Sequence, residues 1–208
     1  MLRFFNNFKK INNHTISLFF NNNRNFLIKN ILYSLKKRHN KQFLFIGLNN
    51  YDIEIILNKK ISIFQILKFF KNSMLYQINT LVDIVCTDFP GKTPRISLIY
   101  VLLSSQYNQR INFFVKPTKM QVSSITKIFK NASWFEREAW DMFGIRFKNN
   151  KDLRRILTDY GFTGHPLRKD FPLTGFYELF FNDVLKSIKT SPVSLTQEYR
   201  KFNFPLPW

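Results

Sequence analysis

Two strand-like segments in the middle of the chain constrain its fold more than any other feature. Residues 95–103 (RISLIYVLL) and 109–115 (QRINFFV) are rich in β-branched and aromatic side chains, and the residues SSQYN connect them. Apolar segments of this kind with short polar connections are typical of neighbouring β-strands. Because few helices intervene, the pattern favours antiparallel pairing and an α+β fold over a doubly wound parallel sheet.

Further elements are predicted around this pair. Residues 43–48, 51–57 and 81–86 have the composition of short strands. Apolar residues at helical spacing within 61–73 predict an amphipathic helix. A short helix is expected over 123–131, and helical phasing continues over 133–144.

The predicted fold class is therefore α+β. We expect a single mixed domain with a largely antiparallel sheet and flanking helices, plus an extended C-terminal tail. Residues 1–42 are assigned to a basic N-terminal extension, 43–175 to the domain and 176–208 to the tail. The tail is rich in proline and aromatic residues. Since a free tail is seldom so aromatic, we expect it to pack on a partner.

The charge of the chain leaves two interpretations open. Its formal net charge is +19, and only basic charges, from Arg3 to Lys41, precede the first acidic residue, Asp52. Clustered Lys and Arg neutralise phosphates, so a basic organellar RNA-binding or ribosomal protein is the alternative function. An AT-rich gene would instead raise Lys, Asn and Phe together and leave a solvated basic surface. We favour the second interpretation, with the N-terminal extension retained in an organelle-encoded chain.

Cysteine and histidine usage limits the chemistry of the chain. Cys86 is the single cysteine, which excludes an internal disulfide and a self-contained iron–sulfur cluster, because a cluster needs about four ligands. His14, His39 and His165 are far apart and lack zinc-type spacing. Any redox cofactor must therefore belong to a partner. No window approaches 18 consecutive apolar residues, so no membrane span is predicted.

Charged residues of both signs gather between residues 134 and 172. Helical spacing places Arg137 and Asp141 one turn apart as a favourable pair, with Glu138 on the same face. Two close carboxylates are suited to acid–base catalysis or to binding a hard cation. We favour a structural network in which nearby arginines donate hydrogen bonds to these carboxylates. The candidate donors are Arg154, Arg155 and Arg168.

A carboxylate-dependent hydrolase is a third interpretation. It requires Glu138, Asp141 and His165 to converge in a pocket that solvent can reach. However, His165 lies in the turn context Gly164-His165-Pro166, where a histidine is more often a structural hydrogen-bonding residue than a base. No catalytic, cofactor-binding or metal-binding residue is expected in the chain.

Ordered motifs in the same region resemble those of a known family. They are Glu136-Arg137-Glu138, DMFGI at 141–145, DLRRIL at 152–157 and TDYGFTGHPLRKDFPLTG at 158–175, with VDIVCTDFP at 82–90, RISLIYVLLSSQYNQRI at 95–111 and SPVSLTQEYRKF at 191–202. Together they resemble the 30-kilodalton-type subunit of respiratory complex I, the family of NADH dehydrogenase subunit 9. The resemblance covers about residues 80–208.

The resemblance implies a non-catalytic structural subunit of the peripheral matrix arm of proton-pumping NADH:ubiquinone oxidoreductase, at the mitochondrial inner membrane. It implies packing against the large quinone-module subunit and cluster-bearing subunits. Flavin and iron–sulfur clusters would be carried by those partners, and no nucleic acid would be bound. We expect ion pairs, within the chain and at interfaces, from eight residues: Glu136, Arg137, Glu138, Asp141, Arg154, Arg155, Arg168 and Asp170.

The chain departs from the family pattern at two places. The family has His-Pro before the Asp-Leu-Arg-Arg run, whereas this chain has Asn150-Lys151, so no histidine role is carried over to that position. After Gly175 the family has an Arg-Tyr-Asp run, where this chain has Phe180-Phe181-Asn182. We expect apolar contact to replace a salt bridge there.

Overall fold

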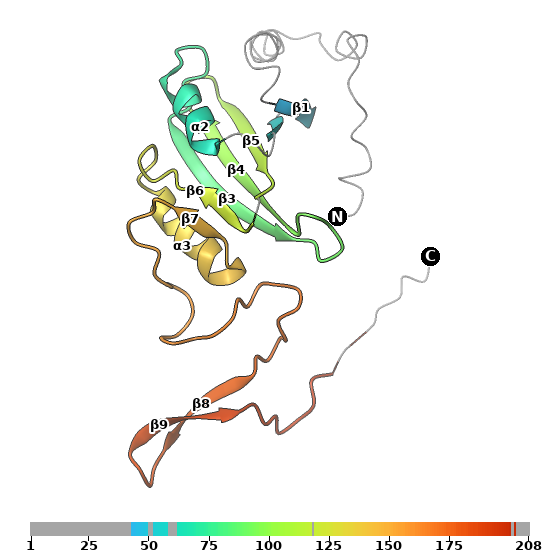
Figure 1. Ribbon diagram of the computed structural model, residues 1–208, viewed down its shortest axis with the longest axis vertical. Coiled ribbons are helices and arrows are strands. Elements are labelled where there is room, and N and C mark those ends of the chain that lie inside the picture. The colour runs from blue at the N-terminus through green and yellow to red at the C-terminus, as the bar shows by residue number, and fades with distance from the viewer. Residues whose placement is uncertain (1–42, 50–51, 58–61, 118, 201, 203–208) are drawn as a thin grey trace.

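A five-stranded sheet forms the centre of the molecule in the computed structural model, which describes residues 43–49, 52–57, 62–117, 119–200 and 202. The strand order is β1-β2-β5-β4-β3 (Figure 1). The strands are Phe43–Asn49 (β1), Asp52–Leu57 (β2), Thr80–Asp88 (β3), Ile96–Ser104 (β4) and Gln109–Val115 (β5). Neighbouring strands are antiparallel except β2 and β5, which are parallel. The predicted strands and the largely antiparallel α+β fold are therefore confirmed.

The alternation of side chains along the strands explains which face of the sheet is buried. In β4, Ile96, Leu98, Tyr100 and Leu102 are fully buried, and the residues between them are only half-buried. Successive side chains of a strand point to opposite faces, so one face of the sheet carries the core. Strand β5 continues that face with Ile111 and Phe113.

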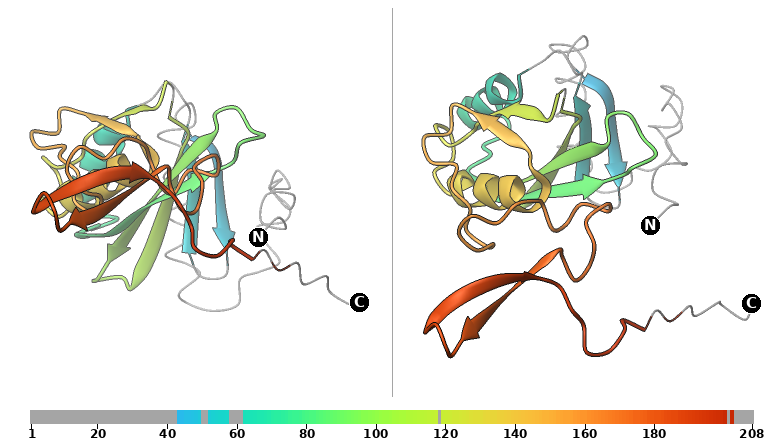
Figure 2. Two further views of the ribbon diagram at one scale, coloured as in Figure 1. Left: turned by 90° about the horizontal axis from the view of Figure 1, so that it is seen from below. Right: turned by 60° about the horizontal axis from the view of Figure 1, so that its bottom comes forward.

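Both described helices pack against this buried face (Figure 2). Helix α2 (Ile63–Asn72) confirms the predicted amphipathic helix, and its Phe70 ring meets the Phe113 ring of β5 edge-on, with centroids 5.0 Å apart. Helix α3 (Ala132–Phe143) lies over β3. Its buried Ala132 and Ala139 join the same apolar cluster as the sheet and α2.

The helix predicted over 123–131 is wrong. Strand β6 (Gln121–Ser123) pairs in parallel with β7 (Arg146–Lys148), and residues 126–128 form a turn. The hydroxyl of Ser124 hydrogen-bonds the hydroxyl of Thr126 at 2.9 Å and accepts the Thr126 amide at 3.3 Å. Such local side-chain bonds compete with helical backbone bonds, which explains the turn.

The C-terminal region contains a hairpin that the sequence pattern did not predict. Strands β8 (Tyr177–Asn182) and β9 (Ser187–Pro192) pair antiparallel and extend away from the main sheet, as Figures 1 and 2 show. The predicted basic extension, residues 1–42, lies outside the described residues. Within the described part of the chain, no helix has both the length and the apolar character needed to cross a membrane.

Candidate functional site

Asp141, near the end of α3, is the centre of a buried hydrogen-bond network. Its side chain is fully buried. Oδ1 accepts hydrogen bonds from Arg155 Nη1 and from the Thr158 hydroxyl, both at 2.6 Å. Oδ2 accepts the backbone amides of residues 156, 157 and 158 at 3.2, 2.8 and 3.0 Å. One carboxylate therefore holds the segment 155–158 against the end of α3.

These donors keep Asp141 charged. Burial by itself would raise the pKa of this carboxyl group, but the Thr158 hydroxyl, the amides of Leu157 and Thr158, and Arg155 together hold it well below its usual range. Both oxygens are occupied by donors from the chain itself. The carboxylate is therefore committed to structure and is not poised to accept a proton from a substrate.

Arg155 extends the network from Asp141 to two aromatic rings. Its guanidinium carbon lies 4.9 Å from the centroid of Trp140 and 5.6 Å from that of Phe162. Nη2 also donates to the carbonyl oxygen of Gly164 at 3.0 Å. A planar guanidinium can stack and donate several hydrogen bonds at once, which a lysine could not reproduce.

His165 and Arg168 contact the backbone carbonyl groups at the C-terminal end of α3. Gly144 ends the helix with φ of +77°, and Arg168 Nε donates to the carbonyl of Phe143 at 2.7 Å. His165 Nδ1 lies 3.0 Å from the carbonyl oxygen of Asp141. Partial burial, and then the neighbouring arginines, lower the pKa of His165. His165 thus has the structural role expected for a histidine in a turn.

A second charged cluster joins the end of β3 to residues 169 and 170. Arg95 donates to both oxygens of Asp88 at 2.6 Å and to both oxygens of Asp170 at 2.8 and 3.0 Å. The amide of Lys169 also donates to Asp88 at 2.8 Å. Sequence reasoning named Asp170 but missed Asp88 and Arg95. The motif VDIVCTDFP contains Asp88, yet nothing in its local sequence reveals a partner 81 residues away.

Glu136 differs from the arginine pairing expected for it. It is fully buried, and its Oε1 accepts the amide of Ile125 at 2.7 Å while Oε2 accepts Asn150 Nδ2 at 2.8 Å. Among the described residues, its hydrogen bonds thus come from neutral groups. Burial raises the pKa of Glu136, although these hydrogen bonds oppose the effect. Asn150 occupies the position where the family pattern has histidine.

The predicted pairing of Arg137 with Asp141 is not formed. Arg137 Nε donates to the carbonyl of Arg154 at 3.0 Å, and its guanidinium stacks over the Trp134 ring at 5.1 Å. Arg154 instead pairs with Asp152 at 2.8 Å in an exposed contact. Asp141 is unavailable to Arg137 because the segment that follows α3 folds back onto it.

The hydrolase interpretation fails on the placement of its carboxylates. Glu138 is exposed, whereas Asp141 is fully buried and surrounded by donors, so the two do not share a solvent-reachable site. The described residues contain no group of three or more His, Cys, Asp and Glu side chains that could hold a metal ion. The fold and site instead define an α+β domain in which buried carboxylates hold the segment after α3 against the rest of the domain.

Comparison with known proteins identifies the family. The family model for the respiratory-chain NADH dehydrogenase, 30 Kd subunit, matches residues 56–177. The chain therefore belongs to this family, as the motifs indicated. This assignment supports the respiratory function and not the RNA-binding alternative.

Individual relatives agree with the family. The chain is 46% identical over 147 residues to NADH dehydrogenase (ubiquinone) iron-sulfur protein 3 of Arabidopsis thaliana, covering 70% of this chain and 77% of the relative. It is 47% identical over 151 residues to NADH-ubiquinone oxidoreductase subunit 9 of Reclinomonas americana, covering 72% and 74%.

A solved structure supports the fold. The likeness is to a chain of the membrane-bound sulfane sulfur reductase, an archaeal respiratory membrane complex, with a TM-score of 0.59 and 21% identity. It covers 70% of this chain and 85% of the other. At this level of identity the likeness concerns the fold alone.

Proposed function

We propose that the chain is a non-catalytic structural subunit of the peripheral arm of proton-pumping NADH:ubiquinone oxidoreductase, where it scaffolds the quinone module. Family membership supports its place in the respiratory complex. The redox activity belongs to the complex, and the flavin and iron–sulfur clusters belong to partner subunits. The lone Cys86 supports this division, since a cluster needs about four ligands.

The observation that carries the scaffold role is the two-faced character of the β8–β9 hairpin. Residues directly opposite each other in an antiparallel pair place their side chains on the same face. The register pairs Tyr177 with Pro192, Leu179 with Thr190 and Phe181 with Ile188, which makes one face largely apolar. The other face carries Glu178, Phe180, Asn182, Ser187, Lys189 and Ser191.

The apolar face of this hairpin is left largely exposed by the described residues of the chain. Tyr177, Leu179, Phe181 and Ile188 are 69%, 53%, 57% and 72% exposed. An isolated two-stranded hairpin is marginally stable in water, so an apolar hairpin of this kind needs another surface to hold it. The proposed surface is an apolar groove of the large quinone-module subunit. The departure Phe180-Phe181-Asn182 then places Phe181 directly in that contact.

The charged residues divide into two groups under this proposal. Asp141, Arg155 and Arg168 act within the chain and fix the path of the segment that leads to the hairpin. Glu136, which is fully buried, also acts within the chain, through neutral partners. The more exposed members face neighbouring subunits on the matrix side of the inner membrane, and one of them, Asp170, also binds Arg95 within the chain. They are Arg137, Glu138, Arg154 and Asp170.

Co-migration on native gels tests this proposal. The unmodified chain should run with NADH-oxidising activity, and the double variant Leu179→Ser, Phe181→Ser should shift to the free fraction because its docking face is lost. A matched variant on the opposite face, Glu178→Ser with Lys189→Ser, should still co-migrate. Full co-migration of the apolar-face variant would show that the hairpin does not hold the chain in the complex.

A further inference from the structure

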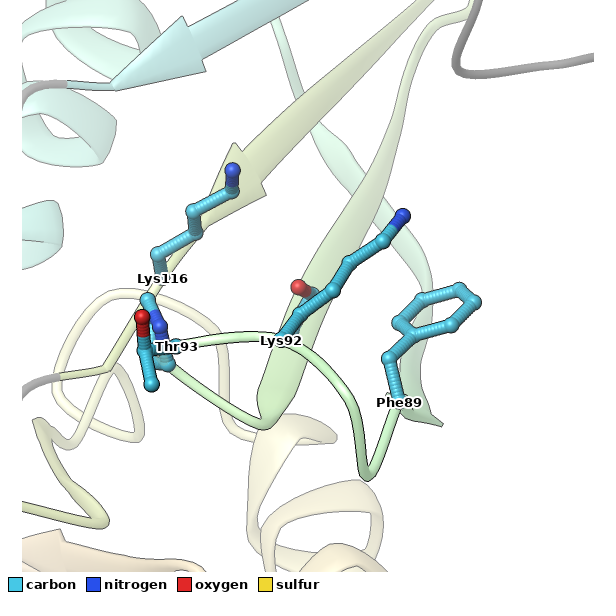
Figure 3. A pocket seen from close by; sticks show the side chains of 6 residues that line it. Phe89, Lys92, Thr93 and Lys116 are labelled. Atoms are coloured by element: carbon cyan, nitrogen blue, oxygen red, sulfur yellow. The ribbon is translucent and has the colours of Figure 1, made fainter.

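A small pocket lies where the β3–β4 loop folds over one end of the sheet. Its volume is about 210 Å³, and it is lined by Phe89, Lys92, Thr93, Pro94, Ser97 and Lys116. Figure 3 shows Lys116 beside Thr93 and Lys92 between Thr93 and Phe89, with both ammonium groups extended to the same side of the loop. The scaffold role described above uses none of these side chains.

Strand register explains why residues from distant segments meet here. Leu98 of β4 pairs with Val115 of β5, so the residues next to them, Ser97 and Lys116, adjoin at the end of the sheet. Ile96 and Leu98 are fully buried, which places Ser97 on the face opposite the core. The sheet thus supplies one hydroxyl and one ammonium group from its outer face.

The base of the loop is fixed by the ion pair at its two ends. Asp88 and Arg95 flank residues 89–94 and are joined by two 2.6 Å hydrogen bonds. The Phe89 amide donates to the Arg95 carbonyl at 2.9 Å, and Lys92 Nζ lies 4.7 Å from the centroid of the Phe89 ring. The base of the loop is therefore fixed by contacts within the chain, and one of the two cations lies over an aromatic ring.

The charges that line the pocket favour an anionic ligand, and the volume of the pocket limits the ligand to a small one. Two ammonium and two hydroxyl groups line the pocket, and its six lining residues include no carboxylate. The nearby carboxylate of Asp88 is already occupied by Arg95 and the Lys169 amide. The volume lies below the roughly 300–1,000 Å³ typical of drug-sized ligand sites, so a small anionic group fits better than a nucleotide.

We propose that this pocket binds a phosphate group, either free or in a lipid headgroup, through Lys92, Lys116, Thr93 and Ser97. A tetrahedral phosphate spreads its oxygens in three dimensions and so can accept from donors placed on several sides, whereas the acceptor sites of a carboxylate lie near one plane. Lysine binds phosphate as a point charge and requires no fixed fork geometry. The site needs no residue of the hairpin or of the Asp141 network.

Titration of the full-length chain tests the proposal. Inorganic phosphate, with chloride replaced at constant ionic strength, should give saturable shifts of the backbone amides of Lys92, Thr93 and Ser97 in NMR spectra. Affinity should fall by about tenfold or more in Lys92→Gln and in Lys116→Gln, since each removes a charge-assisted hydrogen bond. The exposed helical residue Lys68 supplies the control, because Lys68→Gln should bind as the unmodified chain does.

A second arm distinguishes the source of the phosphate. Phosphatidylcholine vesicles with and without phosphatidic acid are sedimented with the chain, and retention that needs both phosphatidic acid and the two lysines assigns a lipid headgroup. Lysine-dependent binding of inorganic phosphate alone assigns the free ion. Absence of binding in both arms would overturn the proposal. So would an equal loss in Lys68→Gln, or a loss of complex assembly in the lysine variants with phosphate affinity unchanged.

Discussion

Arg95 and Asp88 form a two-pronged ion pair in which Nε–Oδ1 and Nη2–Oδ2 are both separated by 2.6 Å. The side chain of Asp88 is 1% exposed, and Arg95 holds its pKa below the usual range. The same guanidinium also donates hydrogen bonds to Asp170, whose side chain is 61% exposed. One arginine thereby ties the sheet to the segment that leads into the C-terminal hairpin.

The two carboxylates that share Arg95 should differ in their contribution to stability. Asp88→Asn should lower the free energy of unfolding by about 2 kcal/mol, because it removes the charge that pairs with Arg95 and weakens the hydrogen bond from the Lys169 amide. This figure already allows for the partial exposure of Arg95, which weakens the ion pair. Asp170→Asn should have a distinctly smaller effect because water already solvates that group. Urea denaturation of the two variants measures the difference. Equal losses would mean that Asp88 is not the anchor.

Gly144 should tolerate no side chain. Its φ is +77°, and an added Cβ would lie 2.6 Å from the His165 ring and against the Arg168 guanidinium. Gly144→Ala should therefore cost more than about 2 kcal/mol, from backbone strain and displaced side chains. Gly161 has φ of +70° with nothing within 4 Å of the added atom, so Gly161→Ala isolates the strain alone, about 1 kcal/mol. Thermal unfolding of both variants compares the two costs.

Glu136 should make stability fall as pH rises. Its pKa is raised from the ordinary 4.5 by burial, so the folded chain binds this proton more tightly than the unfolded chain. Its contribution is present at low pH and is lost as pH rises above 4.5 through the folded pKa. Glu136→Gln should lack this fall, while the exposed Glu138→Gln should keep it. Urea midpoints across a pH series provide the measurement, and an unchanged slope in Glu136→Gln would refute the assignment.

Asp141 should have the opposite pH dependence. Its pKa is lowered from the ordinary 3.8, so its contribution is present above that value and is lost as pH falls through the folded pKa. At neutral pH, Asp141→Asn should cost about 3 kcal/mol because Arg155 loses its buried partner. The penalty should shrink in acid. Asp152→Asn, in an exposed pair with Arg154, serves as the control and should change stability little.

The sequence pattern predicted the elements well where burial alternates with period two. β4 is an example, because its buried and half-buried residues alternate without interruption. It failed over 123–131, where apolar Ile125, Ile128 and Phe129 sit at near-helical spacing around a turn. Local hydrogen bonds of the Ser124 and Thr126 hydroxyl groups favour the turn over a helix there, and the spacing of apolar residues carries no information about such bonds.

The candidate site was predicted less completely, because its partners are distant in sequence. The favoured network named Arg154, Arg155 and Arg168 as donors to Glu138 and Asp141, and Arg155 does pair with Asp141, whereas helical spacing also paired Asp141 with Arg137. The choice depended on the chain folding back after Gly144, which no local pattern specifies. Asp88 and Arg95 were missed for the same reason. Glu136 shows a further limit, since complete burial beside a neutral Asn150 is a tertiary property.

We propose that this chain holds the complex together and takes no part in its chemistry. Arg155→Ala tests it most directly, because Arg155 joins α3, two aromatic rings and the 155–164 segment. Native gels quantify assembled complex, and NADH:ubiquinone turnover is measured per assembled complex from the same membranes. We predict that assembled complex falls while turnover per complex stays unchanged. A normal amount of complex with slowed electron transfer would contradict the scaffold function.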